Sequence, residues 1–210
     1  MTTTDAPSIW LQTLADVRDT AASDRPTPGG GSITAVAATL GLSLVLMALA
    51  ITLKKTPDDP ALAQLDQEGR ELLDRLTPHA DRDIALFSQF MDALALPRDT
   101  PAQKDARQRA RQQALLDATH GPLDAATDVA RALGLARRAL PLASRHVRSD
   151  VLAGADLLHG ALRGVLRNVD INLPGIRDEA TRASLQQRAD ALLAEGDACY
   201  RDVTPTGVER

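Results

Sequence analysis

The chain has 210 residues, a formal net charge of −4 and only 2 % aromatic residues. This length can bury a full hydrophobic core, so we expect one domain over 1–210, with disordered tails at 1–7 and 203–210. Negative charge and scarce stacking side chains argue against a nucleic-acid partner. The lone Cys199 excludes an intramolecular disulfide, and no signal-peptide pattern opens the sequence, so we expect a cytoplasmic protein.

Residues 8–22 are expected to form the first amphipathic helix. Trp10, Leu14, Val17 and Ala21 recur at steps of four, three and four, which places them on one helical face. The prolines and glycines of 24–31 then interrupt the helix.

Three consecutive glycines, Gly29, Gly30 and Gly31, precede Ser32 and a long apolar stretch. Glycine adopts backbone conformations closed to other residues, and a serine at this position is a favoured helix N-cap. The pattern predicts a glycine loop that leads into a helix N-terminus. Such a loop is either a tight turn or a cradle for an electronegative ligand group.

The central stretch from Ile33 to Leu53 contains no charged side chain. As a helix it would be about 31 Å long, enough to cross a bilayer. We favour a buried central helix and no membrane contact, because the stretch is rich in small residues and no second such run exists. Pro57 and Pro60 are expected to end it.

The remaining apolar spacings predict further helices and no strands. Thr100 and Gln103 match a capping box, Gly121-Pro122 and Pro141 are expected to interrupt the chain, and small residues in 149–168 imply close approach of another helix. The expected ranges are 61–76, 79–96, 101–119, 122–140, 149–168 and 178–199. The predicted fold class is all-α, a helical bundle around a buried central apolar helix.

Two stretches carry a family resemblance. PTPGGGS at 26–32, followed by a small-residue helix with Met47, Thr52, Lys54 and Lys55, resembles the cyclodeaminase/cyclohydrolase family of folate enzymes. This family includes the cyclodeaminase domain of formimidoyltransferase-cyclodeaminase and the stand-alone methenyltetrahydrofolate cyclohydrolases. The Ser-Asp start, small-residue helix and Asn-Val-x-x-Asn end of 149–172 are also similar to the family. The resemblance covers roughly 8–200 and implies a cyclodeaminase-like fold.

The chain departs from the family at the end of the central helix. The family's Asn-Leu-Thr is replaced by Ala50-Ile51-Thr52, and its glycine, lysines and tyrosine are replaced by LKKT at 53–56. A polar amide and an aromatic ring are therefore missing near the expected site. This departure bears on the activity and not on the fold.

Two aspartates are the candidate catalytic residues. Asp83 precedes Phe87 by one turn on an otherwise apolar face, and the family carries an acidic residue and a phenylalanine at this spacing. The alternative for Asp83 is a solvated or arginine-paired carboxylate, and His79 is spaced to pair with it. Asp150 follows Ser149 at an expected helix start, where the alternative is an N-cap.

The resemblance also implies substrate-binding residues. The glycine backbone and the two asparagines would orient the pterin, and the two lysines would contact the glutamate end. These residues are Gly29, Gly30, Gly31, Ser32, Asn168, Asn172, Lys54 and Lys55. The alternative for Asn168 is a helix C-cap.

Other polar groups give weaker signals. A basic cluster could hold the carboxylates of a folate tail or be a solvated helical face; it consists of Arg137, Arg138, Arg145, His146 and Arg148. His120 and His159 lack partners at metal-ligand spacing, so no metal is predicted.

The resemblance implies a homodimer with the folate cleft near the subunit contact. The substrate would be a tetrahydrofolate derivative, with no permanently bound cofactor. The reaction would form 5,10-methenyltetrahydrofolate with loss of ammonia, or open it to 10-formyltetrahydrofolate. Two alternatives stay open: a catalytically altered ligand-binding or scaffold dimer, and an enzyme acting on a different amidine, imine or cyclic substrate.

Overall fold

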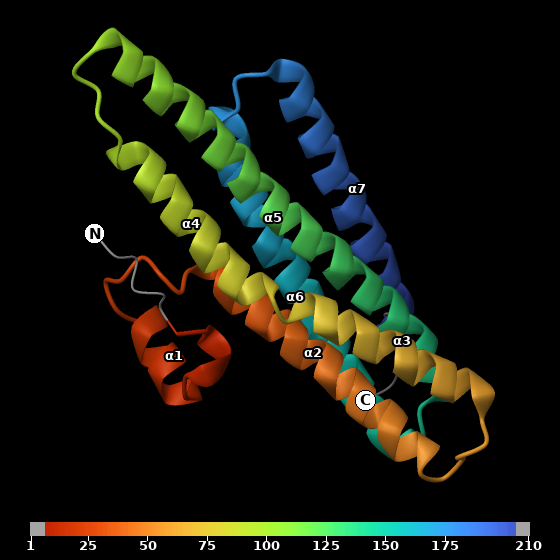
Figure 1. Cartoon of the computed structure of the whole chain (residues 1–210). Coiled ribbons are helices and arrows are strands. Elements are labelled where there is room, and N and C mark those ends of the chain that lie inside the picture. Colours follow the sequence, from red (N-terminus) through yellow and green to blue (C-terminus); the bar gives the residue numbers. More distant parts are fainter. Residues whose placement is uncertain (1–6, 205–210) are drawn as a thin grey trace.

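The structure is a computed structural model that describes residues 7–204. Every regular element in that range is helical, which confirms the predicted all-α class (Figure 1). The α-helices are α1 (Leu14–Ala21), α2 (Gly30–Leu53), α3 (Pro60–Leu76), α4 (His79–Ala95), α5 (Pro101–Leu142), α6 (Arg148–Asn172) and α7 (Glu179–Val203). Short 3-10 turns lie at Ile9–Leu11, Arg145–Val147 and Leu173–Gly175. Most of the expected tails lies outside the described residues, but Val203 is buried at the end of α7.

Helix α2 is the centre of the bundle, as predicted, and packs against α3, α4, α5 and α6. It runs antiparallel to α6, and the two backbones approach closely at Gly41 and Gly154. A Cβ added to Gly154 would lie 2.6 Å from the Gly41 carbonyl oxygen, nearer than real Cβ contacts allow. The small residues of α6 therefore admit a neighbouring helix, as their pattern indicated.

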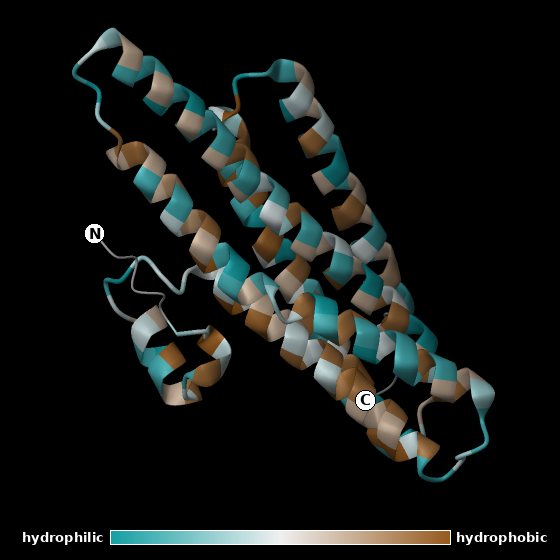
Figure 2. Cartoon of the chain, in the orientation of Figure 1, coloured by the Kyte–Doolittle hydropathy of each residue, from teal (hydrophilic) through white to brown (hydrophobic). Residues whose placement is uncertain are grey.

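Helix α2 is also long and apolar enough to cross a membrane by length and composition, with a mean hydropathy of 2.3. Half of its apolar window is buried inside the bundle. The uncovered half includes Leu40 and Met47, which are 48 % and 40 % exposed, and Leu157 of α6 is 41 % exposed. Figure 2 shows brown, hydrophobic residues along the length of α2. The helix therefore has one face in the core and an apolar stripe outside it.

The first segment differs from its prediction as a single helix over 8–22. A 3-10 turn comes first, and Thr13 then starts α1 with a capping box to Asp16. Leu14 is 78 % exposed and does not share a buried face with Trp10, whose Nε1 donates to the Thr77 carbonyl at 2.9 Å. The cap restarts the helix and changes the face that Leu14 presents.

Helix α5 is continuous, so the predicted breaks at Gly121-Pro122 and Pro141 are wrong. Proline has no N–H group, so Pro122 leaves the Ala118 carbonyl without its usual helical donor. The Asn172 side chain supplies a donor instead, with Nδ2 at 2.9 Å from the Ala118 oxygen. A bond from another helix thus satisfies the carbonyl that the proline leaves free.

Two helix starts test specific capping predictions. Thr100 and Gln103 form the expected capping box at the start of α5. Helix α6 begins earlier than expected, at Arg148, with Val147 as its N-cap residue. Asp150 lies inside the first turn and makes no capping bond, so the N-cap alternative for Asp150 is wrong.

Candidate active site

The candidate site begins where the chain enters α2. Gly29 is the N-cap residue, in an extended conformation and with no side-chain cap bond. The prediction of Ser32 as the N-cap is therefore wrong, because the helix already begins at Gly30. Ser32 is fully buried in the first turn, and its Oγ donates to Oδ2 of Asp83 at 2.7 Å.

Gly31 lies at the junction of α2, α4 and α6. A Cβ added to Gly31 would lie 2.1 Å from Oδ1 of Asp83 and 2.5 Å from Nδ2 of Asn168. Only a glycine leaves room for the carboxylate and the amide to approach the backbone of this turn. Of the predicted residues, the structure therefore unites Gly31, Ser32, Asp83 and Asn168.

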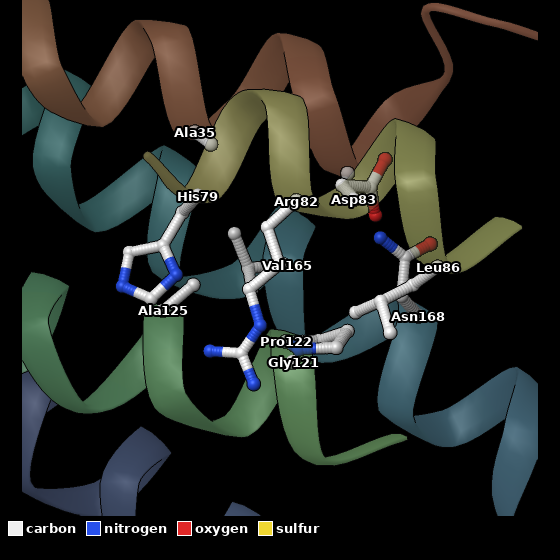
Figure 3. Close-up of a pocket in the computed structure, with 11 residues that line it drawn as sticks. Ala35, His79, Arg82, Asp83, Leu86, Gly121, Pro122, Ala125, Val165 and Asn168 are labelled. Atoms are coloured by element: carbon white, nitrogen blue, oxygen red, sulfur yellow. The ribbon is translucent and has the colours of Figure 1, made fainter. Parts of the chain in front are cut away.

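A small cavity of about 10 Å³ opens beside this junction, with space for one water-sized sphere. Apolar groups such as Ala35, Leu86 and Val165 form much of its wall. Figure 3 shows the Asp83 carboxylate and the Asn168 amide directed toward each other at one end of the cavity, with His79 at the other. The cavity therefore combines an apolar wall with acid–base groups.

Asp83 is half-buried, and no described arginine or lysine forms an ion pair with it. The adjacent Arg82 is engaged elsewhere, with Nη1 at 3.2 Å from Oδ2 of Asp124. The Ser32 hydroxyl holds the carboxylate, which lies beside the first turn of α2, the positive end of that helix's dipole. An anion without a cationic partner is suited to stabilise a positive charge that a ligand brings.

Asn168 and Asn172 have different surroundings although both end the same motif. Helix α6 continues to Asn172, so the C-cap alternative for Asn168 is wrong. The Asn168 side chain lines the cavity. The Asn172 amide is half-buried on the Ala118 carbonyl. The structure thus gives Asn172 a bond inside the fold and Asn168 a place beside Asp83.

Gly29 and Gly30 also lie at the Gly31 end, but Lys54, Lys55 and Asp150 lie at the opposite end of α2 and α6, which we call the lysine end. Lys54 and Lys55 are exposed just after α2, where the Thr52 hydroxyl accepts a bond from the Ser144 amide at 2.9 Å. At 1.5 Å per residue, Lys54 is about 35 Å from Gly31 along α2. Asp150 is about 27 Å from Asn168 along α6. Within one chain, the predicted site is divided between two ends.

Sequence reasoning assigned the wrong partner to His79. Its Nε2 lies 3.2 Å from Oδ2 of Asp128 on α5. The partner of His79 is therefore Asp128 and not Asp83. Burial raises the pKa of Asp128, but His79, Arg75 and Arg131 outweigh burial and hold that pKa below its ordinary value. Asp128 is 49 residues from His79, so no local pattern could have linked them.

The basic cluster is partly neutralised. Arg137 pairs with Asp202 at 3.1 Å, and Arg138 pairs with Glu68. Within residues 7–204, no group of three or more histidine, cysteine or acidic side chains is placed to hold a metal ion. The absence of a metal stays a prediction.

The fold and this junction define an all-helical bundle with an acid–base pocket at a glycine-led helix start. A family model described as formiminotransferase-cyclodeaminase matches residues 13–191. The chain therefore belongs to the formiminotransferase-cyclodeaminase family.

Individual relatives agree with this assignment. Formimidoyltransferase-cyclodeaminase from Gallus gallus is 33 % identical over 175 residues, covering 80 % of this chain but 32 % of that protein. The chain thus spans about a third of the length of the chicken protein. Methenyltetrahydrofolate cyclohydrolase from Methylorubrum extorquens is 30 % identical over 198 residues, covering 93 % of this chain and 95 % of that protein.

The fold also matches a solved structure, formiminotetrahydrofolate cyclodeaminase from Thermotoga maritima. The TM-score is 0.82 at 25 % sequence identity, over 93 % of this chain and 95 % of that one.

Proposed function

We propose that this chain is a folate one-carbon enzyme that forms or opens 5,10-methenyltetrahydrofolate, as a formimidoyltetrahydrofolate cyclodeaminase or a methenyltetrahydrofolate cyclohydrolase. The observation that carries the proposal is the Asp83 carboxylate, held by Ser32 beside Gly31 and Asn168 without a cationic partner among residues 7–204. The chain's membership of the family, and its similarity to relatives named as a cyclodeaminase and as a cyclohydrolase, support the same chemistry. The folate is the substrate, and no permanently bound cofactor is required.

The chemistry explains why an unpaired carboxylate is useful. In cyclisation, N10 attacks the formimidoyl carbon, the N10 proton moves to the departing nitrogen, and ammonia leaves a methenyl cation. In the hydrolytic reaction, water adds to that cation, loses a proton, and the ring opens as N5 is protonated. Asp83 stabilises the cation in both directions and can transfer a proton, help that is typically worth about 10²–10⁴ in rate.

A spectrophotometric assay of methenyltetrahydrofolate tests this activity directly. We expect the purified chain to form it from 5-formimidoyltetrahydrofolate or to accelerate its loss in water. Folate binding without turnover would instead support a ligand-binding dimer. The replaced segment at Ala50–Thr56 favours this second candidate, because it lacks the family's amide and aromatic ring. Absence of folate binding would point to another amidine, imine or cyclic substrate.

A homodimer is part of the proposal. The uncovered stripe of α2 is centred near Leu40, and Leu157 of α6 extends it. In a two-fold dimer the same patch meets itself. An axis crossing α2 near Leu40 would pair the two copies of α2 antiparallel and bring the lysine end of one copy to the Gly31 junction of the other. Cytoplasmic location is also proposed, in agreement with the free, buried thiol of Cys199.

This dimer would reunite the two halves of the predicted site, with the partner's Asp150 and lysines near Asp83. Asp150 would then act with Asp83 on the reacting groups, and Lys54 or Lys55 would contact the glutamate end. Light scattering should give twice the chain mass, and Leu40→Glu should reduce it to that of a monomer.

Mixing two variants tests whether the site is shared. We expect Asp83→Asn and Asp150→Asn each to be impaired. Co-expression with different tags should restore about a quarter of wild-type turnover, because half of the dimers are mixed and each retains one intact site. Restoration would be absent if Asp150 acts within its own chain or not at all.

A further inference from the structure

The cavity beside Gly31 contains a second acid–base group that the proposed chemistry has not yet used. His79 and Asp83 lie one turn apart on α4, and both line the cavity. The cavity of about 10 Å³ has room for about one water beside these lining groups.

His79 is held in a defined orientation. It is 9 % exposed, and Nε2 lies 3.2 Å from Oδ2 of Asp128, which is 8 % exposed. A neutral imidazole must present its N–H to the carboxylate, so Nδ1 is left as the acceptor. Nδ1 has no hydrogen bond to any residue within 7–204. In Figure 3, one ring nitrogen lies on the side of the ring nearer to the other lining residues.

Charged side chains surround His79 on its own helix and on α3 and α5. Asp128 on α5 contacts it, with Arg75 of α3 and Arg131 of α5 on the outer side of that carboxylate. Arg82 and Asp83 share its helix, and Arg82 is paired with Asp124. The cavity residues from α2 and α6 are uncharged. Asp128 is thus the carboxylate that orients the imidazole, and Asp83 the one that shares its cavity.

We propose that His79 is a second proton-transfer residue in the reaction, acting at the same cavity as Asp83. This inference rests on the proposed function. In the cyclodeaminase direction, one of the two groups takes the proton that N10 loses when it attacks the formimidoyl carbon. The other gives a proton to the departing nitrogen as its bond to that carbon breaks, so ammonia leaves with both electrons of the bond. One proton enters the pair and one leaves it, so the proton count of the pair is unchanged. A proton that then passes between Asp83 and His79 restores the starting state of each group.

The molecule contains a matched histidine–aspartate pair away from this cavity. His159 on α6 lies 2.6 Å from Asp197 on α7, and its ring stacks on Tyr200 with centroids 4.0 Å apart. This pair joins two helices as the His79–Asp128 pair does, but it lines no cavity beside Asp83. It therefore separates a catalytic effect from the loss of a helix-to-helix bond.

The test compares His79→Gln with His159→Gln in the full chain, using formimidoyltetrahydrofolate turnover between pH 5 and 9. We expect His79→Gln to lower kcat by about 10²-fold and to remove one limb of the pH–rate profile, with KM nearly unchanged. His159→Gln should lower the melting temperature and keep the pH profile.

A second variant guards against a folding defect in the first. Asp128→Asn retains a hydrogen-bonding group, and it should move the same limb to lower pH, because an amide cannot stabilise the imidazolium. A wild-type profile in soluble His79→Gln, or an unmoved limb in Asp128→Asn, would overturn the role of His79 while leaving the proposed function intact. A wild-type chain without folate turnover would overturn both.

Discussion

The two ends of the α2–α6 pair differ in structure, although the same two helices form both. At the Gly31 junction, polar groups converge: the Ser32 hydroxyl is fully buried on Asp83, and a missing side chain makes room for Asn168. At the lysine end, Thr52 and Ser144 bond to each other, and Lys54 and Lys55 extend into solvent. The first end has the geometry of a pocket, whereas the second has charge without an enclosure.

The difference has a simple physical origin. Buried polar groups must be hydrogen-bonded, so the Gly31 junction is fixed in place by its own polar contacts. Exposed lysines carry no such constraint and contribute a field that solvent screens. A ligand with a flat ring and an anionic tail matches the two ends in that order, provided that a second copy brings them together.

Gly31→Ala should disturb the Gly31 junction most, because it should lower both turnover and stability. The new Cβ would collide with both Asp83 and Asn168, so these groups must move. We expect turnover to fall by about 10²-fold or more, with a loss of about 1–3 kcal/mol in unfolding free energy. The control is Gly134→Ala on α5, where a Cβ meets nothing within 4 Å. Equal activity in the two variants would show that the junction is not the site.

Asp83→Asn tests the charge without changing the shape. We expect kcat to fall by about 10²–10⁴-fold while folate affinity changes little, because the carboxylate acts on charge that develops during the reaction. Measurement of kcat and of folate binding by titration separates the two effects. If binding falls in proportion to turnover, Asp83 is a substrate-binding residue and not a proton-transfer group.

Asp128→Asn should destabilise the chain in a pH-dependent way. The folded-state pKa of Asp128 is lowered, so its stabilising effect is present above the unfolded pKa of about 3.9 and is lost as pH falls through the folded pKa. We expect a loss of about 1–3 kcal/mol at pH 7 that begins to shrink below about pH 4 and disappears as pH falls through the folded-state pKa. Urea unfolding across this range measures it. Asp202→Asn, which removes an exposed ion pair with Arg137, should change stability by less than about 1 kcal/mol.

Asn172→Ala should have a smaller effect than Asp128→Asn, about 1 kcal/mol, because it leaves the Ala118 carbonyl without a donor. A double-mutant cycle with Pro122→Ala sharpens the test, since alanine restores the helical N–H to that carbonyl. The loss on Asn172→Ala should then shrink. An equal loss in both backgrounds would contradict the assigned bond, and an unchanged folate affinity would separate this role from substrate binding.

Most helix positions could be predicted from the sequence, because residues close together in the chain determine where these helices begin and end. The apolar run of α2, the prolines at its end and the Thr100–Gln103 capping box each act within a few residues. The continuity of α5 through Pro122 was not readable, because its missing bond is replaced by a residue 50 positions downstream of that proline. Nor was the helix start at Gly30, where a backbone without a side-chain cap begins the helix before Ser32.

The sequence by itself determined the all-α class, the central apolar helix and the family motif, because periodicity, helix-ending residues and a glycine-rich string are properties of neighbouring residues. Tertiary structure decided which candidates meet: Asp83 with Gly31, Ser32 and Asn168, and His79 with Asp128. It also separated Asp150 and the lysines from that group. The reason is that helices are rigid rods, so a side chain's partners depend on how the rods cross and not on its distance along the chain.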